Sequence, residues 1–230
     1  MLIVTMQFPA ARAGAMVCGV AAAALCLYSQ NTPTPPRANE PGELPPRSAP
    51  SDYPAQAKAG AVTIAAEFKG HFVPTPQGTL TTEDYVVVEA AFFGEPGAKI
   101  RLSVNDFSLR INGKKNTLPS QPYGMIAPSL KDPEWEPPKP PEAKNKSSFS
   151  GGGGGGGGQG DPPPPPPKPS VEVQRGWVAR TVKASMAEGD RPVPQAGLIF
   201  FPYRGPSKGI DSLELIYKGA AGQTKLTLQP

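Results

Sequence analysis

The chain has 230 residues, including 32 prolines and 26 glycines. These two residue types make up about a quarter of the chain, a share typical of segments without a packed core. Because they are clustered, the remainder suffices for one domain of ordinary size rather than two. The 23 basic and 19 acidic residues give a net charge of +4 without a dense basic block, and so mild an excess argues against nucleic-acid binding.

An apolar, alanine-rich run lies near the N-terminus. It covers residues 13–28 and is preceded by a single charge, Arg12. At about 16 residues it is shorter than the roughly 20 residues of a bilayer span, so it favours a signal peptide over a buried helix. We expect residues 1–30 to be a signal peptide or an uncleaved membrane segment, and the protein to be exported to the periplasm, the cell surface or the medium. Contact with a membrane is expected only through this segment.

Both cysteines of the chain, Cys18 and Cys26, lie inside this run. Val17 and Leu25 precede them, whereas a lipoprotein signal requires a small residue at that position. If the segment is removed, the mature chain has no thiol, which excludes a disulfide scaffold, a thiolate metal site and a cysteine nucleophile.

A proline-rich stretch follows the leader. Residues 31–59 carry almost no large apolar side chains, so they cannot bury enough surface to offset the entropy lost on ordering. We expect a disordered tether over these residues, with the first strand of the domain beginning at Ala61.

Apolar residues then alternate with polar ones, the pattern of β-strands. Residues 85–93 carry the strongest strand signal, and the alternation covers residues 61–70, 100–104 and 107–111. The run 85–93 is apolar on both faces, which predicts a central strand covered on both sides. Asn112-Gly113 follows the last of these segments, and this dipeptide readily adopts the positive φ angles of a tight hairpin.

An insert of low complexity interrupts the β pattern. We assign it to residues 133–169, with eight consecutive glycines at 151–158 and six prolines at 162–167. The glycine run lacks the Lys-Ser/Thr pair of a phosphate-binding loop and follows no strand, which favours a linker. The proline run predicts a polyproline II rod of about 20 Å. It resembles a ligand for aromatic-lined domains, but a spacer is the better interpretation in an exported chain.

One helix and three strands are predicted beyond the insert. Ser170 is suited to cap a helix over residues 171–188, which Gly189 then ends. In chain order the further strands are expected at residues 197–201, 212–217 and 224–228.

About seven strands without alternating βαβ units predict a mainly β fold, an antiparallel sandwich with one helix and a long disordered insert. The predicted organisation is a leader (1–30), a tether (31–59), the first part of the sandwich (60–132), the insert (133–169), and the helix with the second part of the sandwich (170–230).

Four segments carry a family resemblance, in the order Val86–Val88, Asp106-Phe107-Ser108-Leu109 with Gly113, Gly197 with Phe200, and Leu213–Tyr217. They resemble the immunoglobulin-like β-sandwich domain of unknown function found on exported bacterial proteins and lipoproteins, similar in architecture to the mycobacterial immunoprotective extracellular antigen. The resemblance covers roughly residues 61–115 and 195–229 and implies an immunoglobulin-like sandwich with no catalytic residues. The insert and the helix depart from this pattern.

Few individual residues are candidates for chemistry. His71 is the sole histidine and no serine lies in a G-x-S-x-G context, so we interpret His71 as a loop residue rather than a catalytic base. Glu83-Asp84 is more typical of the start of a strand than of a metal site. Trp135 is interpreted as packing on the sandwich edge rather than on a sugar, and Asn145 begins a glycosylation sequon that matters only in a eukaryotic source.

These observations predict no catalytic, cofactor-binding or metal-binding residue, and they assign no ligand-binding residue. The leading hypothesis is an exported, non-enzymatic immunoglobulin-like domain that contacts a protein or another envelope component. The alternative is a module that binds a small molecule or glycan, and an enzyme is the least favoured class. A pocket between the helix and the sheet, lined by Trp177 and Tyr123, would favour the alternative, whereas a filled interface would favour the leading hypothesis.

Overall fold

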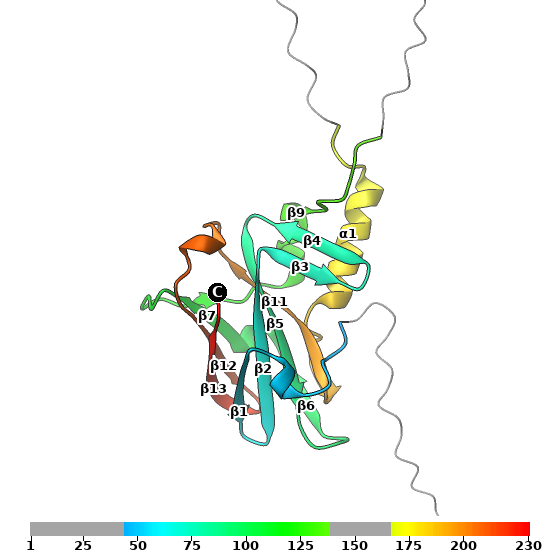
Figure 1. Cartoon of the computed structure of the whole chain (residues 1–230). Helices are drawn as coiled ribbons and strands as arrows, with labels where there is room; N and C mark the ends of the chain where they lie inside the picture. The colour runs from blue at the N-terminus through cyan, green and yellow to red at the C-terminus, as the bar shows by residue number, and fades with distance from the viewer. Residues whose placement is uncertain (1–43, 139–166) are drawn as a thin grey trace, which may run out of the picture. The chain divides into compact units, whose positions relative to one another are not determined.

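The computed structural model describes residues 44–138 and 167–230 (Figure 1). Over these residues the protein is mainly β, with antiparallel strand pairing throughout its sheets and one α-helix. This confirms the predicted fold class, a β-sandwich with a single helix. The predictions for the leader, for the tether up to residue 43 and for residues 139–166 of the insert lie outside the described residues.

The first sheet of the sandwich joins strands from both sides of the insert. Its order is β1-β2-β5-β11, with β1 at Ala55–Ala59, β2 at Val62–Gly70, β5 at Tyr85–Phe93 and β11 at Gln195–Pro202. The β11 strand pairs with β5 over its whole length, for example Ile199 with Val88. The insert therefore interrupts a single sheet, and β5 is the central strand that its two apolar faces predicted.

The second sheet has the order β13-β12-β7-β8. It contains β7 at Phe107–Ile111, β8 at Leu118–Pro119, β12 at Leu213–Gly219 and β13 at Gly222–Leu228. Here too a strand after the insert, β12, pairs with a strand before it, β7, with Leu215 opposite Leu109.

The main core lies between these two sheets. Ile64 and Val88 from the first sheet, and Leu109 and Leu215 from the second, are all fully buried in one apolar cluster. The rings of Phe92, Phe107 and Tyr217 meet in the same cluster, with centroids 5.2–6.0 Å apart. The alternating residues identified in the sequence therefore fill the sandwich interior.

A third layer covers the outer face of the first sheet (Figure 1). It consists of β3 (Phe72–Thr75), β4 (Gly78–Thr82), β9 (Leu130–Lys131) and the helix α1 (Val171–Ala184), which contacts β3 and β9. Trp177 of α1 is buried there with Val87 and Phe200 of the sheet. The remaining elements are the ribbon of β6 (Lys99–Leu102) with β10 (Gly189–Pro192) and the 3₁₀ turns η1 (Pro50–Asp52), η2 (Val104–Asp106), η3 (Tyr123–Met125), η4 (Ala127–Ser129) and η5 (Ser207–Gly209).

The predicted tether over residues 31–59 is wrong for its last part. Strand β1 occupies Ala55–Ala59 and pairs with β2, and the ring of Tyr53 is buried against the sheet. Ala55 and Ala59 are small enough to pack in the core while Gln56 stays exposed. Alanine, glutamine and lysine are weak strand formers, so tertiary packing rather than local preference makes this strand.

The helix is shorter than the predicted span of residues 171–188. Ser170 caps it as expected, since its side chain accepts a hydrogen bond from the amide of Val173, but α1 ends at Ala184. The amide of Met186 donates instead to the carbonyl of Leu198 at 2.9 Å, and the Met186 side chain is buried in the main core. Extended backbone is needed to reach both partners, which is why the helix stops before Gly189.

The Asn112-Gly113 prediction is confirmed in its backbone angles, with φ of 53° and 63°. The amide of Lys114 closes the turn on the carbonyl of Ile111. The chain does not return at once as a hairpin strand, because the partner strand β8 begins only at Leu118. Asn112 instead accepts hydrogen bonds from the amides of Asp211 and Ser212, which ties the turn to the other flank.

Candidate functional site

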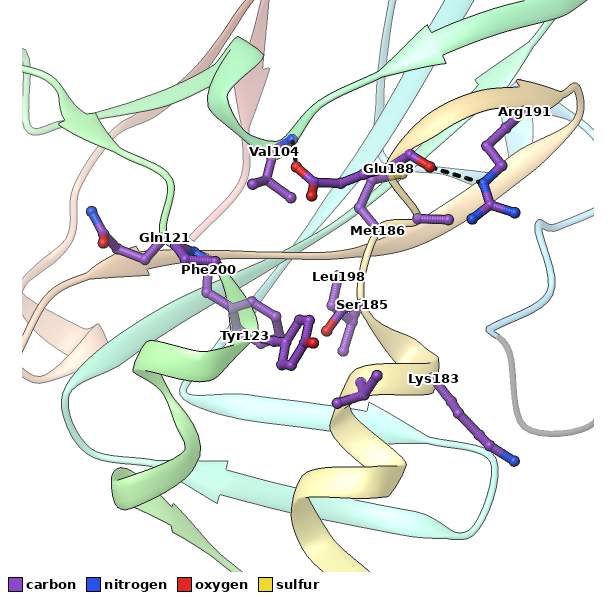
Figure 2. A pocket seen from close by; sticks show the side chains of 13 residues that line it. Val104, Gln121, Tyr123, Lys183, Ser185, Met186, Glu188, Arg191, Leu198 and Phe200 are labelled. Atoms are coloured by element: carbon purple, nitrogen blue, oxygen red, sulfur yellow. Dashed lines mark hydrogen bonds between the residues drawn. The ribbon is translucent and has the colours of Figure 1, made fainter.

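A cavity of about 390 Å³ lies beside β11, between the end of α1 and the segment that leads into η3. Figure 2 shows it from close by, with the ring of Tyr123 reaching toward the end of α1. Its volume falls at the lower end of the range of small-ligand sites, roughly 300–1,000 Å³. It is therefore large enough to take a bulky side chain or a small organic group.

The floor of the cavity is apolar and buried. Leu198, Phe200 and Met186 line it and are at most 3% exposed. Tyr123 and Val182, by contrast, are 46% and 38% exposed at its rim. A group that enters the cavity would contact this floor and would bury the exposed side chains of Tyr123 and Val182.

The cavity exists because two segments attach to the same strand edge at neighbouring points. The amide of Met186 donates to the carbonyl of Leu198 at 2.9 Å, and the amide of Gln121 donates to the carbonyl of Phe200 at 2.8 Å. The two acceptors are two residues apart, or about 7 Å along the strand. The segments diverge from these points, and the space between them forms the cavity.

Gly197 permits this arrangement. A Cβ atom at this position would collide with the backbone of Met186 and Ser185. An isolated glycine inside a strand often marks the close approach of another backbone. Gly197 was therefore a sequence signal for the cavity wall, although the sequence did not show which segment approaches it.

Polar groups lie around the cavity in defined pairings. The hydroxyl of Ser185 donates to the carbonyl of Thr181 at 2.6 Å. A carboxylate oxygen of Glu188 accepts from the amide of Val104 at 3.3 Å, and Nε of Arg191 donates to the carbonyl of Glu188 at 3.1 Å. The charged residues that line the cavity are Glu188, Arg191 and Lys183, one carboxylate and two cations.

The two aromatic residues expected in one pocket are separated. Tyr123 lines the cavity, but Trp177 is 7% exposed and packs in the filled interface between α1 and the sheet. Trp135 packs against this interface, as its interpretation required, with its ring 6.5 Å from that of Trp177. The helix interface is thus filled around Trp177, and the cavity lies at the C-terminal end of the helix.

His71 lies in the turn between β2 and β3, as expected of a loop residue. Its Nδ1 is 2.7 Å from the carbonyl oxygen of Tyr85, and its Nε2 is 2.9 Å from that of Gly205. The imidazole also stacks on the ring of Tyr203. These contacts connect the start of β5 to the loop after β11, and they place His71 outside the cavity lining.

Glu83 and Asp84 lie just before β5 and form separate ion pairs. Glu83 pairs with Lys131 at 2.5 Å, and Asp84 pairs with Arg204 at 2.8 Å. The two carboxylates therefore hold two different neighbouring segments at the start of the strand. The sequon at Asn145 lies outside the described residues.

A second polar feature, which the sequence did not reveal, lies on the outer face of the first sheet. Glu67 and the buried Glu89 are opposite each other on β2 and β5, and Lys69 pairs with them at 2.8 Å and 3.0 Å. Arg47, from the segment before β1, pairs with both carboxylates and lies over the ring of Tyr53. We call these five residues the charge cluster.

Burial and pairing act in opposite directions in the charge cluster. Burial raises the pKa of Tyr53 to about 12. Burial alone would also raise the pKa of Glu67, but hydrogen bonds from Lys69 and Arg47 outweigh it and lower that pKa below its ordinary value. The cluster stabilises the attachment of the N-terminal segment to the sheet, and its side chains pair with one another rather than point into a cavity.

No protein-family model matches the chain, and comparisons with curated proteins and with solved structures also find no match. Within residues 44–138 and 167–230, no helix has the length and apolar character to cross a bilayer. Over the same residues, no group of three or more His, Cys, Asp or Glu side chains is arranged to hold a metal ion. The cavity beside β11 is the feature of this part of the chain best suited to bind another molecule.

Proposed function

We propose that this protein is a non-enzymatic, immunoglobulin-like interaction domain that takes part of a protein partner into the cavity beside β11. The observation that carries the proposal is the contrast between floor and rim. Buried Leu198, Phe200 and Met186 form the floor of the cavity, whereas the apolar side chains of Tyr123 and Val182 are exposed at its rim. Aromatic side chains at the rim of an apolar pocket are typical of protein interfaces.

The lining supports binding rather than catalysis. Ser185 is the hydroxyl on the helix side of the cavity, and its proton is directed to the carbonyl of Thr181. His71 is absent from the cavity lining and is held by two carbonyl oxygens elsewhere. A serine without an adjacent base does not form a nucleophile–base pair.

The place of action in this proposal is the cell envelope or the extracellular space. The apolar run at residues 13–28 supports export. The likeness of four strand segments to the immunoglobulin-like domain of exported bacterial proteins also supports export. A protein partner or another envelope component is then the natural counterpart of the cavity.

A small-molecule or glycan ligand is the second candidate. The volume of about 390 Å³ favours it, because a cavity of this size also encloses a small ligand. The two candidates differ in what contacts the exposed rim. A protein partner would cover Tyr123 and the surface beyond it, whereas a small ligand would be enclosed within the cavity.

Site-specific photocrosslinking tests the proposal in the native cell. We would place benzoylphenylalanine at Tyr123 in the full chain and, as the matched control, at Phe72, an aromatic residue that is 58% exposed on β3. We expect a discrete protein adduct from position 123 that weakens when Val182 is changed to Glu, and no such adduct from position 72. Equal crosslinking at both positions, or none at position 123, would contradict the proposal.

A further inference from the structure

We infer that the partner segment presents a bulky apolar side chain next to a carboxylate, and that Arg191 receives the carboxylate while the cavity floor receives the apolar group. This inference rests on the proposed function and names the chemistry of the partner. It commits to an acidic peptide segment of a protein, and a free small acid becomes an alternative that the experiment can detect.

The apolar half of the inference comes from the floor. Leu198 and Phe200 belong to the apolar cluster on the covered outer face of β11, and Met186, whose side chain is buried in the main core, also lines the cavity. Burial of an apolar group against them is favourable by roughly 25 cal/mol per Å² of apolar surface removed from water. The volume of about 390 Å³ admits one aromatic or large aliphatic side chain with its adjoining backbone.

The acidic half comes from how the charged groups at the cavity are engaged. Glu188 already accepts a hydrogen bond from the amide of Val104. Arg191 uses Nε for the carbonyl of Glu188, and its two terminal nitrogens have no hydrogen bond to any residue of the described ranges. A guanidinium with both terminal nitrogens available matches a carboxylate in a two-pronged contact.

The placement of Arg191 points the same way. Arg191 lines the cavity and is exposed to solvent, so an incoming carboxylate can reach its guanidinium. Figure 2 shows Arg191 beside Glu188 on the side of the cavity where Met186 lies. A cationic ligand would have to approach this guanidinium, which repels it.

Matched peptides test the inference by NMR titration of the ¹⁵N-labelled chain. The probes are acetyl-Gly-Glu-Phe-Glu-Gly-amide, its counterpart with lysine in place of both glutamates, and 3-phenylpropanoate as a free small acid. We expect the acidic peptide to shift the amide resonances of Tyr123 and Met186 and to bind at least two- to fivefold more tightly than the basic peptide, as an exposed ion pair allows. We expect 3-phenylpropanoate to bind more weakly than the acidic peptide.

Charge variants identify the residue responsible. R191Q is expected to abolish the preference for the acidic peptide, and E188Q is expected to increase it. Lys225, which is exposed on β13 away from the cavity, supplies the control, because K225Q lowers the net charge by one as R191Q does. It should leave the preference unchanged.

Each other outcome overturns a defined part of the account. If the basic peptide binds at the cavity as tightly as the acidic one, the inference fails while the proposed function stands. If 3-phenylpropanoate binds more tightly than the acidic peptide, the occupant is a small acid rather than a protein segment. If no probe shifts resonances at the cavity, both the inference and the proposed site fail.

Discussion

The two faces of the sheet β1-β2-β5-β11 are covered in different ways. Its inner face meets one continuous second sheet, and the contact is made of apolar side chains such as Val88 and Phe92. Its outer face carries Val87, Glu89 and Ala91 on the same central strand, and three separate segments cover it. These are the N-terminal segment, the β3–β4–β9 layer and α1.

This difference shows where stability and where function reside in the fold. The inner face is covered by a continuous sheet, and its side chains belong to one buried apolar cluster. The outer face is covered by separate segments. Both the charge cluster and the cavity lie where one of these segments meets its neighbours. We expect substitutions on the inner face to reduce stability most, and substitutions at the outer junctions to have smaller effects that depend on pH or on a ligand.

The largest effect is expected from Phe92→Ala. Phe92 is fully buried between the sheets and its ring contacts those of Phe107 and Tyr217. Removing a buried phenylalanine typically costs about 3–5 kcal/mol of the free energy of unfolding, as measured by urea denaturation. Phe72→Ala is the control, because Phe72 is 58% exposed, and a loss there as large as at Phe92 would contradict the assignment of the core.

Arg47→Ala tests the outer face at the charge cluster. Removing one member of a fully buried ion pair costs about 3–5 kcal/mol. The Arg47 side chain is 31% exposed and Lys69 still pairs with Glu89 at 3.0 Å, so we expect a smaller loss of about 1–2 kcal/mol in the same assay. Arg204→Ala should cost almost nothing, because Arg204 is 83% exposed in its pair with Asp84. Equal losses in the free energy of unfolding for Arg47→Ala and Arg204→Ala would contradict a stabilising role of the charge cluster.

Glu67 gives the charge cluster a pH dependence of known sign. Its pKa is lowered in the folded state, so its contribution to stability is fully present above the ordinary glutamate pKa of about 4.3 and is lost as pH falls through the folded value. Glu67→Gln should therefore destabilise the protein at pH 7 and differ little from the wild type near pH 2. Unfolding curves at the two pH values measure this, and a difference that grows toward acid would show that the sign is wrong.

The inner face could be predicted from the sequence. Of the outer face, the sequence predicted only that β5 is covered there, and it did not predict which segments cover it. Ile100, Leu102 and Leu109 alternate with polar neighbours, and period-two alternation identifies a buried strand face without knowledge of its partner. Strand β1 lacks strong strand formers, and β3 contains Pro74, so neither carries that signal. Both are strands because of the segments that they pair with.

The cavity could not be predicted from the sequence, for a related reason. Its walls meet only because Met186 and Gln121 bond to two carbonyls of β11. Residues 185–188 continue the helical spacing of Val178 and Val182, so local periodicity predicts helix where tertiary hydrogen bonds impose extended chain. Tyr123 was named as a candidate, but nothing in the sequence connected it with Gly197, whose missing side chain admits the backbone of Met186.

The smallest effect is expected from shortening the insert. Deleting residues 147–167 roughly halves the connection between the two flanks, and each halving of a flexible loop lowers the cost of closing it by about 0.6 kcal/mol. We expect cooperative unfolding with slightly increased stability, measured by thermal melting. Loss of the cooperative transition would mean that the insert contributes to the fold.

The central claim is that the flanks of the insert form one sandwich, because β11 pairs with β5 and β12 pairs with β7. A protease site placed in the glycine run at residues 151–158 allows the purified protein to be cut between the flanks. The account predicts that the two fragments stay together on size-exclusion chromatography and unfold in a single transition. Separation of the fragments without denaturant would contradict it.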